Sequence, residues 1–144
     1  MAYYGIPVGQ KYLPNDVGMA FSKGIVTDLL RGELGFKGYV NSDTGIIGPP
    51  GANRAWGLET TSVENQLTVA INARADVLSG FNSQSQILNL VKSGALPQSR
   101  IDESVKRLLK EQFQLGLFEN PYNDPAVAVA TVGKAEFKAR ADLA

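Results

Sequence analysis

Apolar residues recur at helical spacing near the start of the chain. The stretch from about Gly18 to Glu33 carries one apolar stripe, which is formed by Phe21, Ile25, Val26, Leu29 and Leu30. This spacing predicts an amphipathic helix. Asn15 or Asp16 is placed to cap its first turn, and Gly32 and Gly35 suit its end.

Three later segments also have helical patterns. Thr61-Ser62-Val63-Glu64 has the spacing of a capping box, and it precedes an inward face made of Val63, Leu67, Ala70 and Ile71. A short helix is predicted around residues 87–91 and is closed by Ser93-Gly94. A longer helix starts at Ser99 or Asp102 and has Gly116 as its C′ residue, with five side chains inward: Ile101, Val105, Leu108, Leu109 and Phe113.

Two short segments between these helices are predicted strands. They are Gly38–Asp43, which ends in a carboxylate, and Ala75–Gly80, which ends in a glycine. Residues 1–4 are apolar and aromatic, which is typical of the end of another strand. Because strands alternate with helices, the pattern predicts an α/β fold with parallel strands and right-handed crossovers.

The segments that lack periodicity are predicted loops. Gly45–Asn53 contains Gly48-Pro49-Pro50-Gly51 and therefore indicates a loop. Residues 120–125 include two prolines and are predicted to form a linker. Residues 135–144 resume a weak helical pattern.

Composition narrows the possible chemistry. The 14 basic and 14 acidic residues cancel, so the charge gives no indication of a nucleic-acid or anionic membrane partner. The chain has no cysteine and no histidine, which excludes disulfides, thiolate or histidine metal sites and a Ser-His-Asp triad. No apolar run approaches the roughly 20 residues that span a bilayer, and the first residues lack signal-peptide features. The compartment is not indicated.

Asp43 is the leading candidate for chemistry. A carboxylate at the C-terminal tip of a parallel strand lies where α/β enzymes usually keep their active site. There it can act as a nucleophile, as a metal ligand or as a stabiliser of positive charge at an anomeric carbon. Asp is also common at turns. From spacing alone, Asp43 is therefore equally well explained as a residue that only ends the strand or caps the loop.

Three further residues are candidate substrate-binding residues. Trp56, the only tryptophan, follows the predicted loop and either stacks on a ligand at the mouth of a site or fills an apolar gap. Arg54 lies just before it, and Tyr4 lies near a strand end. Asp76, in contrast, lies inside an apolar strand, where a buried, hydrogen-bonded structural carboxylate is the better interpretation.

Three motifs, in order and in register, resemble one family. The run from Asp28 through Gly35-Phe36-Lys37-Gly38-Tyr39-Val40-Asn41-Ser42-Asp43 is similar to the stretch that leads to the nucleophile of family 3 glycoside hydrolases, which are mainly retaining β-glucosidases. Residues 75–80 resemble the last barrel strand of that family, and residues 99–118 resemble its final barrel helix.

The resemblance implies a fold and a mechanism. The fold is part of a (β/α)8 TIM-type barrel, namely its last three parallel strands with their helices, over residues 1–119. Residues 120–144 are then the linker and the start of a second α/β sandwich domain. Asp43 becomes the nucleophile that forms a covalent glycosyl-enzyme intermediate with a β-linked glucoside, and no metal or organic cofactor is implied.

The chain also departs from the family pattern. Thr44 stands where many members have a tryptophan, Arg74 stands where glycine is usual, and the loop at residues 48–53 is longer than expected. A barrel takes about 250 residues, and no acid/base residue is recognised here. We therefore expect a fragment with little activity that self-associates or depends on the missing barrel segments. One alternative is a non-catalytic sugar-binding or assembly module. A weaker alternative is a phosphate-binding α/β domain, because this chain lacks the glycine spacing of a phosphate-binding loop.

Overall fold

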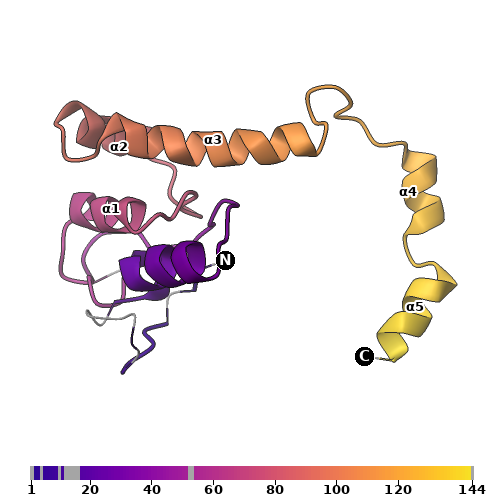
Figure 1. Cartoon of the computed structure of the whole chain (residues 1–144), viewed down its shortest axis with the longest axis horizontal. Helices are drawn as coiled ribbons and strands as arrows, with labels where there is room; N and C mark the ends of the chain where they lie inside the picture. Colours follow the sequence, from indigo (N-terminus) through magenta and orange to yellow (C-terminus); the bar gives the residue numbers. More distant parts are fainter. Residues whose placement is uncertain (1, 4, 10, 12–16, 52–53, 144) are drawn as a thin grey trace. The chain divides into compact units, whose positions relative to one another are not determined.

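The computed structural model describes residues 2–3, 5–9, 11, 17–51 and 54–143. The chain separates into two compact units, Met1–Glu111 and Gln112–Ala144. The first unit holds the helices η1, η2, α1 and α2 and most of α3, and the second holds the end of α3 together with α4 and α5 (Figure 1). Within the described residues, none of the helices combines the length and the hydrophobicity that crossing a bilayer requires.

Three short segments lie side by side in parallel at the centre of the first unit. Isolated bridges pair Ala2 with Ser42 and Asn41 with Val77. The Ala2 N–H donates to the Asn41 carbonyl at 2.9 Å, and the Ser42 N–H donates to the Val77 carbonyl at 2.8 Å. We call this arrangement the three-segment ladder. The parallel order of the segments agrees with the sequence prediction.

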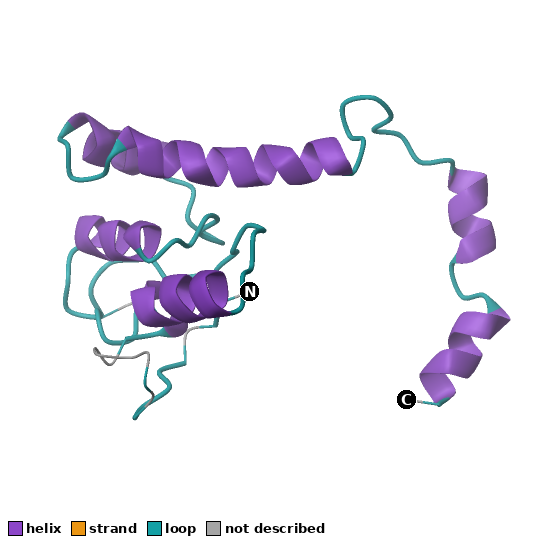
Figure 2. Cartoon of the chain, in the orientation of Figure 1, coloured by secondary structure: helices purple, strands orange, loops and turns teal. Residues whose placement is uncertain are grey.

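The ladder is less regular than predicted, because no part of the described chain forms a full strand (Figure 2). The predicted strands 38–43 and 75–80 are present only as single bridges. The reason is that side chains bond the backbone groups that a strand would pair. The Gly38 carbonyl accepts from Arg31 Nη1 at 2.9 Å, and the Val40 N–H donates to Asp76 Oδ2 at 2.8 Å.

The predicted first helix is divided into two. Met19–Phe21 forms a 3-10 helix, η1, and Gly24–Glu33 forms a π-helix, η2. Ser22 lies between them, and its Oγ accepts from the Ile25 N–H at 3.2 Å. The predicted caps Asn15 and Asp16 lie outside the described residues.

The helix α1, Val63–Asn72, confirms the second predicted helix but not its predicted cap. The capping side chain is Ser62, whose Oγ accepts from the Asn65 N–H at 3.2 Å. Thr61 instead donates its hydroxyl to the Leu58 carbonyl at 2.8 Å. The predicted capping box, which starts at Thr61, is therefore wrong by one residue.

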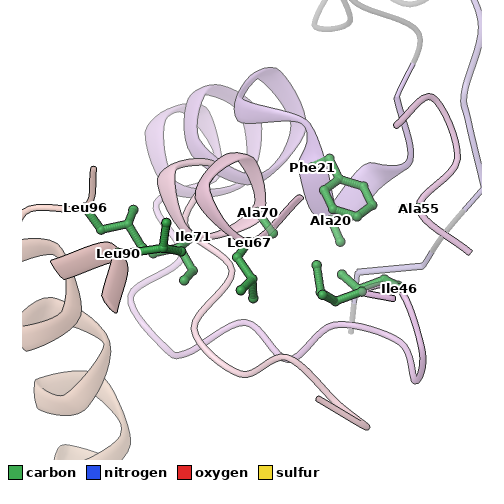
Figure 3. Packing of buried hydrophobic residues seen from close by; sticks show 10 residues of the cluster. Ala20, Phe21, Ile46, Ala55, Leu67, Ala70, Ile71, Leu90 and Leu96 are labelled. Carbon is green, nitrogen blue, oxygen red and sulfur yellow. The ribbon is translucent and has the colours of Figure 1, made fainter. Parts of the chain in front are cut away.

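The core of the first unit gathers around α1 (Figure 3). Leu67, Ala70 and Ile71 are buried there, as predicted, and Val63 is partly buried against them. The predicted loop contributes as much as the helices, because Ile46, Ile47 and Ala55 belong to the same cluster. The remaining buried members of the cluster are Ala20, Phe21, Leu90 and Leu96.

Two further helices follow in the first unit. They are α2, Gln84–Lys92, and α3, Gln98–Gln114. Gly116 has φ +68°, and the Leu117 N–H donates to the Gln112 carbonyl at 3.1 Å, which confirms the predicted C′ glycine of α3.

One prediction about α3 is wrong. The prediction places Val105, Leu109 and Phe113 inward, but these residues are 41–59% exposed. Ile101 alone of the predicted inward residues packs against the buried core cluster. The helical spacing correctly marks an apolar face, but spacing cannot say whether another segment covers it.

The second unit has two short helices, α4 (Pro125–Thr131) and α5 (Ala135–Asp142), and neither has a buried residue. The pattern at 135–144 predicts α5, but α4 was not predicted. Asp124 caps α4 by accepting from the Ala126 N–H at 2.8 Å, and Pro125 occupies the first helical position. Proline is favourable at that position because its missing N–H needs no partner there.

Candidate active site

Asp43 lies at the C-terminal end of the middle segment of the ladder. Its N–H donates to the Ala2 carbonyl at 3.0 Å, so the backbone is held in place by the neighbouring segment. The side chain is only partly buried, and its Oδ1 accepts from the Thr44 N–H at 2.7 Å. The carboxylate is thus oriented by one backbone group, and the residue remains partly exposed.

Hydroxyl groups brace the segment next to Asp43. Ser42 is fully buried, and its Oγ donates to the Asp43 carbonyl at 2.9 Å and accepts from the Ser79 N–H at 3.1 Å. Ser79 Oγ donates to Asn41 Oδ1 at 2.8 Å. These bonds join the tips of the second and third segments, so residues 41–43 cannot shift without breaking several of them.

The turn after Asp43 packs against Gly80. Gly80 has φ +79°, and a Cβ atom at this position would lie 2.9 Å from Thr44 Cγ2. The Gly45 N–H also donates to the Ser79 carbonyl at 3.0 Å. The glycine stop of the third segment is therefore required by the close approach of the turn that follows Asp43.

The loop that follows brings Arg54 next to this turn. Arg54 Nη1 donates to the Thr44 carbonyl at 3.5 Å, and the Arg54 N–H donates to the Gly45 carbonyl at 3.2 Å. Trp56 lies two residues further on, is 42% exposed, and accepts from the Gly18 N–H through its carbonyl at 2.9 Å. The structure thus brings Arg54 close to the residue beside Asp43. Tyr4 lies outside the described residues.

Gln66 organises this loop, and the sequence interpretation did not single it out. It is fully buried on α1. Its Oε1 accepts from the Gly48 N–H at 3.1 Å, and its Nε2 donates to the carbonyls of Leu58 and Thr61 at 3.4 and 3.2 Å. The helical phase contained the signal, because Gln66 shares a face with Leu67 and Ala70 and a buried amide needs partners.

Asp76 lies at the other end of the ladder, and its predicted structural role is confirmed. Its side chain is fully buried. Oδ2 accepts from Arg31 Nη2 at 2.6 Å and from the Val40 N–H at 2.8 Å. Oδ1 accepts from the Ser104 hydroxyl at 2.6 Å and from Arg107 Nη1 at 2.7 Å.

These partners decide the charge of Asp76. Burial acts to raise the pKa of Asp76, but hydrogen bonds from Ser104, the Val40 backbone and Arg107, together with the charge of Arg107, hold the pKa below its ordinary value. Arg100 Nη2 is a further partner at 3.4 Å. Asp76 is therefore ionised and fully engaged, and it positions the segment that carries Asp43 through the Val40 N–H.

The family model described as "Glycosyl hydrolase family 3 N terminal domain" matches residues 13–110. The chain belongs to glycosyl hydrolase family 3. The probable β-glucosidase C of Aspergillus flavus is 42% identical over 143 residues, which cover 95% of this family 3 chain and 22% of that protein. The periplasmic β-glucosidase/β-xylosidase of Dickeya chrysanthemi is 33% identical over 156 residues. This match covers 98% of the chain described here and 23% of the Dickeya protein.

Solved structures agree with this family assignment. A β-glucosidase involved in saponin metabolism from intestinal bacteria is 30% identical and superposes with a TM-score of 0.72, over 85% of this chain and 16% of that one. The family 3 chain thus spans about a fifth of the length of the curated relatives that it matches.

Proposed function

We propose that this chain carries the nucleophile of a retaining β-glucosidase and that Asp43 is this nucleophile. The observation that carries the proposal is the position of Asp43, a partly exposed carboxylate at the C-terminal end of the middle parallel segment. The names of the relatives support the substrate class, a terminal β-linked glucoside. The second activity in the name of the Dickeya relative makes a β-xyloside the first alternative sugar to test.

The geometry supports a defined role for each oxygen of Asp43. Oδ1 accepts from the Thr44 N–H, so Oδ2 is the oxygen for attack on the anomeric carbon. The C–O bond to the leaving group breaks as the Asp43–carbon bond forms, and a general acid protonates the departing oxygen. Water, deprotonated by the same group, then cleaves the ester and releases the sugar with retained configuration. We assign that acid/base to a part of the enzyme outside this chain.

Arg54 and Trp56 are proposed to bind the substrate. Arg54 is held against the turn after Asp43, from which its guanidinium can donate to sugar hydroxyls. Trp56 presents an exposed indole at the end of the same loop, and aromatic rings commonly stack on the apolar faces of sugars. We keep Tyr4 as a third candidate because it lies next to the ladder in sequence.

The architecture is proposed to be the last part of a TIM-type barrel. The three parallel segments, with helices between them in sequence, support this proposal, as do the superposed β-glucosidase folds. We propose further that residues 1–119 belong to the barrel and that residues 120–144 lead into an α/β sandwich domain. The exposed apolar face of α3 supports the proposal that the isolated chain self-associates or needs complementary segments.

A chimera tests the catalytic proposal. Residues 2–143 replace the matched segment of the Aspergillus flavus relative, whose remaining sequence completes the protein. We expect hydrolysis of an aryl β-glucoside, a loss of about 10⁴-fold or more in kcat for Asp43→Ala, and partial rescue by azide. Asp28→Ala, which removes an exposed carboxylate paired with Lys23, is the control and should retain activity. An active chimera that is insensitive to Asp43→Ala would overturn the proposal.

Two measurements complete the test. A 2-fluoro glucoside should label the chimera on the peptide that contains Asp43, and a label on another residue would contradict the assignment. For the isolated chain, sedimentation should show association or partial disorder. A sharply cooperative melt of a monomer at low concentration would contradict that second proposal without affecting the first.

A further inference from the structure

A cavity lies at the end of the ladder away from Asp43. It has a volume of about 550 Å³, and its walls include Arg31, Arg74, Arg107 and Lys37. Arg31 also donates to the Gly38 carbonyl, which places the cavity beside the start of the segment that ends at Asp43. The one acidic residue in its wall is Asp28, whose carboxylate is paired with Lys23 at 2.6 Å. The cavity is therefore lined mainly by cations.

The charges around this cavity do not balance. Three arginines of the wall, Arg31, Arg74 and Arg107, belong to one ion-pair network with Arg100, which is outside the wall. These four guanidinium groups share two carboxylates, Asp76 and Glu103. Four positive and two negative charges leave two positive charges in excess. Burial lowers the pKa of Arg31, and Arg107, Arg100 and Arg74 lower it further against the attraction of Asp76. The side chains of Arg31 and Arg107 are only 10% and 18% exposed, and charges so far removed from water need counter-charges, so an anion would stabilise them.

Arg74 is held in the cavity wall by an unusual backbone conformation. Its φ is +75°, and it is the one non-glycine residue with positive φ in the part of the chain that the structure describes. An L-residue in this conformation is strained by about 1–2 kcal/mol. Arg74 Nη1 pairs with Glu103, which leaves most of its five N–H donors without a protein acceptor among the described residues. The strain is compatible with a binding role for this side chain.

Two other guanidinium groups, those of Arg107 and Arg31, belong to the same cavity wall. Arg107 donates from Nη1 to Asp76 and from Nη2 to Glu103, and each of these two nitrogens carries a second hydrogen. Arg31 Nε is buried and has no hydrogen-bond partner among the described residues. Arg31 Cζ lies over the Phe36 ring, 5.7 Å from its centroid, and the face of the ring attracts the cation.

We propose that this cavity binds a small free oxyanion of the phosphate class, held by Arg74, Arg107 and Lys37. Guanidinium groups form paired hydrogen bonds with tetrahedral oxyanions, and the excess positive charge supplies the attraction. The site is separate from the sugar chemistry proposed for Asp43, and it does not depend on that proposal. A carboxylate from another polypeptide segment is the rival occupant.

Titration of the chimera described above, in which the relative supplies the remaining segments of the barrel, with inorganic phosphate tests the site. Ionic strength is kept constant with sodium chloride, and binding is followed by calorimetry and by the NMR signals of the arginine Nε–H groups. We expect saturable binding with a dissociation constant of about 1 mM and a shift of the Arg31 and Arg74 signals. Sulfate should compete, whereas acetate at equal concentration should not. Competition by acetate with equal strength would favour the carboxylate rival and overturn the proposal.

Variants make the test specific to this cavity. Arg74→Gly removes a donor and also relieves the backbone strain, so it should fold and should bind phosphate about tenfold or more weakly, because it loses charge-assisted bonds. Lys37→Ala should weaken binding by a smaller factor, and Lys92→Ala, which lies outside the cavity wall, is the control. Absence of saturable binding, or equal binding by Arg74→Gly and the parent chimera, would overturn the proposal.

Discussion

The two ends of the ladder each have an aspartate, and the two residues have opposite surroundings. The Asp76 side chain is fully buried, and its carboxylate accepts from three arginines, a serine and a backbone N–H. Asp43, 33 positions earlier, is partly exposed, and its carboxylate accepts from the adjacent Thr44 N–H. The same type of side chain therefore stabilises the fold at the Asp76 end and remains partly exposed at the Asp43 end.

The difference teaches how this fold separates stability from chemistry. A carboxylate that is fully engaged by hydrogen bonds and charges has no oxygen left for a substrate. A carboxylate at the open end of parallel segments can be held by its backbone alone, which here is bonded to Ala2 and braced through Ser42. Asp76 thus fixes the start of the segment through the Val40 N–H, and the proposed nucleophile Asp43 is carried by the same segment.

The largest expected effect is the loss of the Asp76 carboxylate. Asp76→Ala leaves buried arginines and the Val40 N–H unpaired, which should cost about 3–5 kcal/mol of unfolding free energy. Urea unfolding followed by far-UV circular dichroism measures it. Asp28→Ala, at an exposed ion pair, is the control and should cost less than about 1 kcal/mol. Equal losses in the two variants would show that the buried Asp76 carboxylate contributes no more to stability than an exposed ion pair does.

Acid should act on the same group. The pKa of Asp76 is lower in the folded chain than in the unfolded chain, where it is about 3.9. Its contribution to stability is therefore complete at about pH 5 and above, which is about one unit above its pKa in the unfolded chain. The contribution is lost as the pH falls through its pKa in the folded chain. Urea midpoints should therefore fall as the pH is lowered below about 4. Asp76→Asn should flatten that decline, and an unchanged pH profile would contradict the assignment.

Part of this architecture follows from local patterns. The helical spacing of apolar residues and the signals at helix ends predict α1, α2 and α3. Each of these helices has an apolar face and a nearby start or stop signal, and both depend only on neighbouring residues. The same reasoning places Asp43 at the tip of its segment and Asp76 in the interior. The helix α4 was missed although Asp124-Pro125 is a start signal, because a linker explains those prolines equally well.

The remainder depends on contacts between residues far apart in sequence. The strand prediction for 38–43 fails because Arg31 and Asp76 bond its backbone, and no local pattern indicates this. Gln66 was missed for a related reason, since its partners Gly48, Leu58 and Thr61 lie in a loop without periodicity. The exposure of Val105, Leu109 and Phe113 depends on which segments cover α3, which spacing cannot reveal.

Gln66 offers the next largest effect, at the Asp43 end. Gln66→Leu leaves the Gly48 N–H and the Leu58 and Thr61 carbonyls without their partner, which should cost about 1–3 kcal/mol. The loop should also loosen, so trypsin should cut faster after Arg54. Gln84→Leu, at an exposed position of α2, is the control. Unchanged cleavage at Arg54 would show that other contacts hold the loop.

A smaller effect is expected where the two segment tips touch. Gly80 and Gly45 have φ +79° and +76°, so an alanine at either position should cost about 1–2 kcal/mol from backbone strain. At Gly80 the new Cβ also meets Thr44, whereas at Gly45 it meets nothing within 4 Å. Gly80→Ala should therefore cost more than Gly45→Ala. The same Cβ also lies 3.3 Å from the Gly45 backbone nitrogen, so Thr44→Ala should remove only the part of the excess that comes from the Thr44 methyl group, and a double-mutant cycle measures that part.

The smallest expected effect on stability belongs to Asp43. Asn keeps an Oδ1 that accepts from the Thr44 N–H, and the side chain is not sealed in the core, so Asp43→Asn should change the unfolding free energy by less than about 0.5 kcal/mol. The same change should abolish nucleophilic attack in the completed enzyme, because an amide lacks the negative charge. A loss of stability comparable with that of Asp76→Ala would show that Asp43 holds the fold. The two ends of the ladder would then be alike, and the argument for a free carboxylate at the tip would fail.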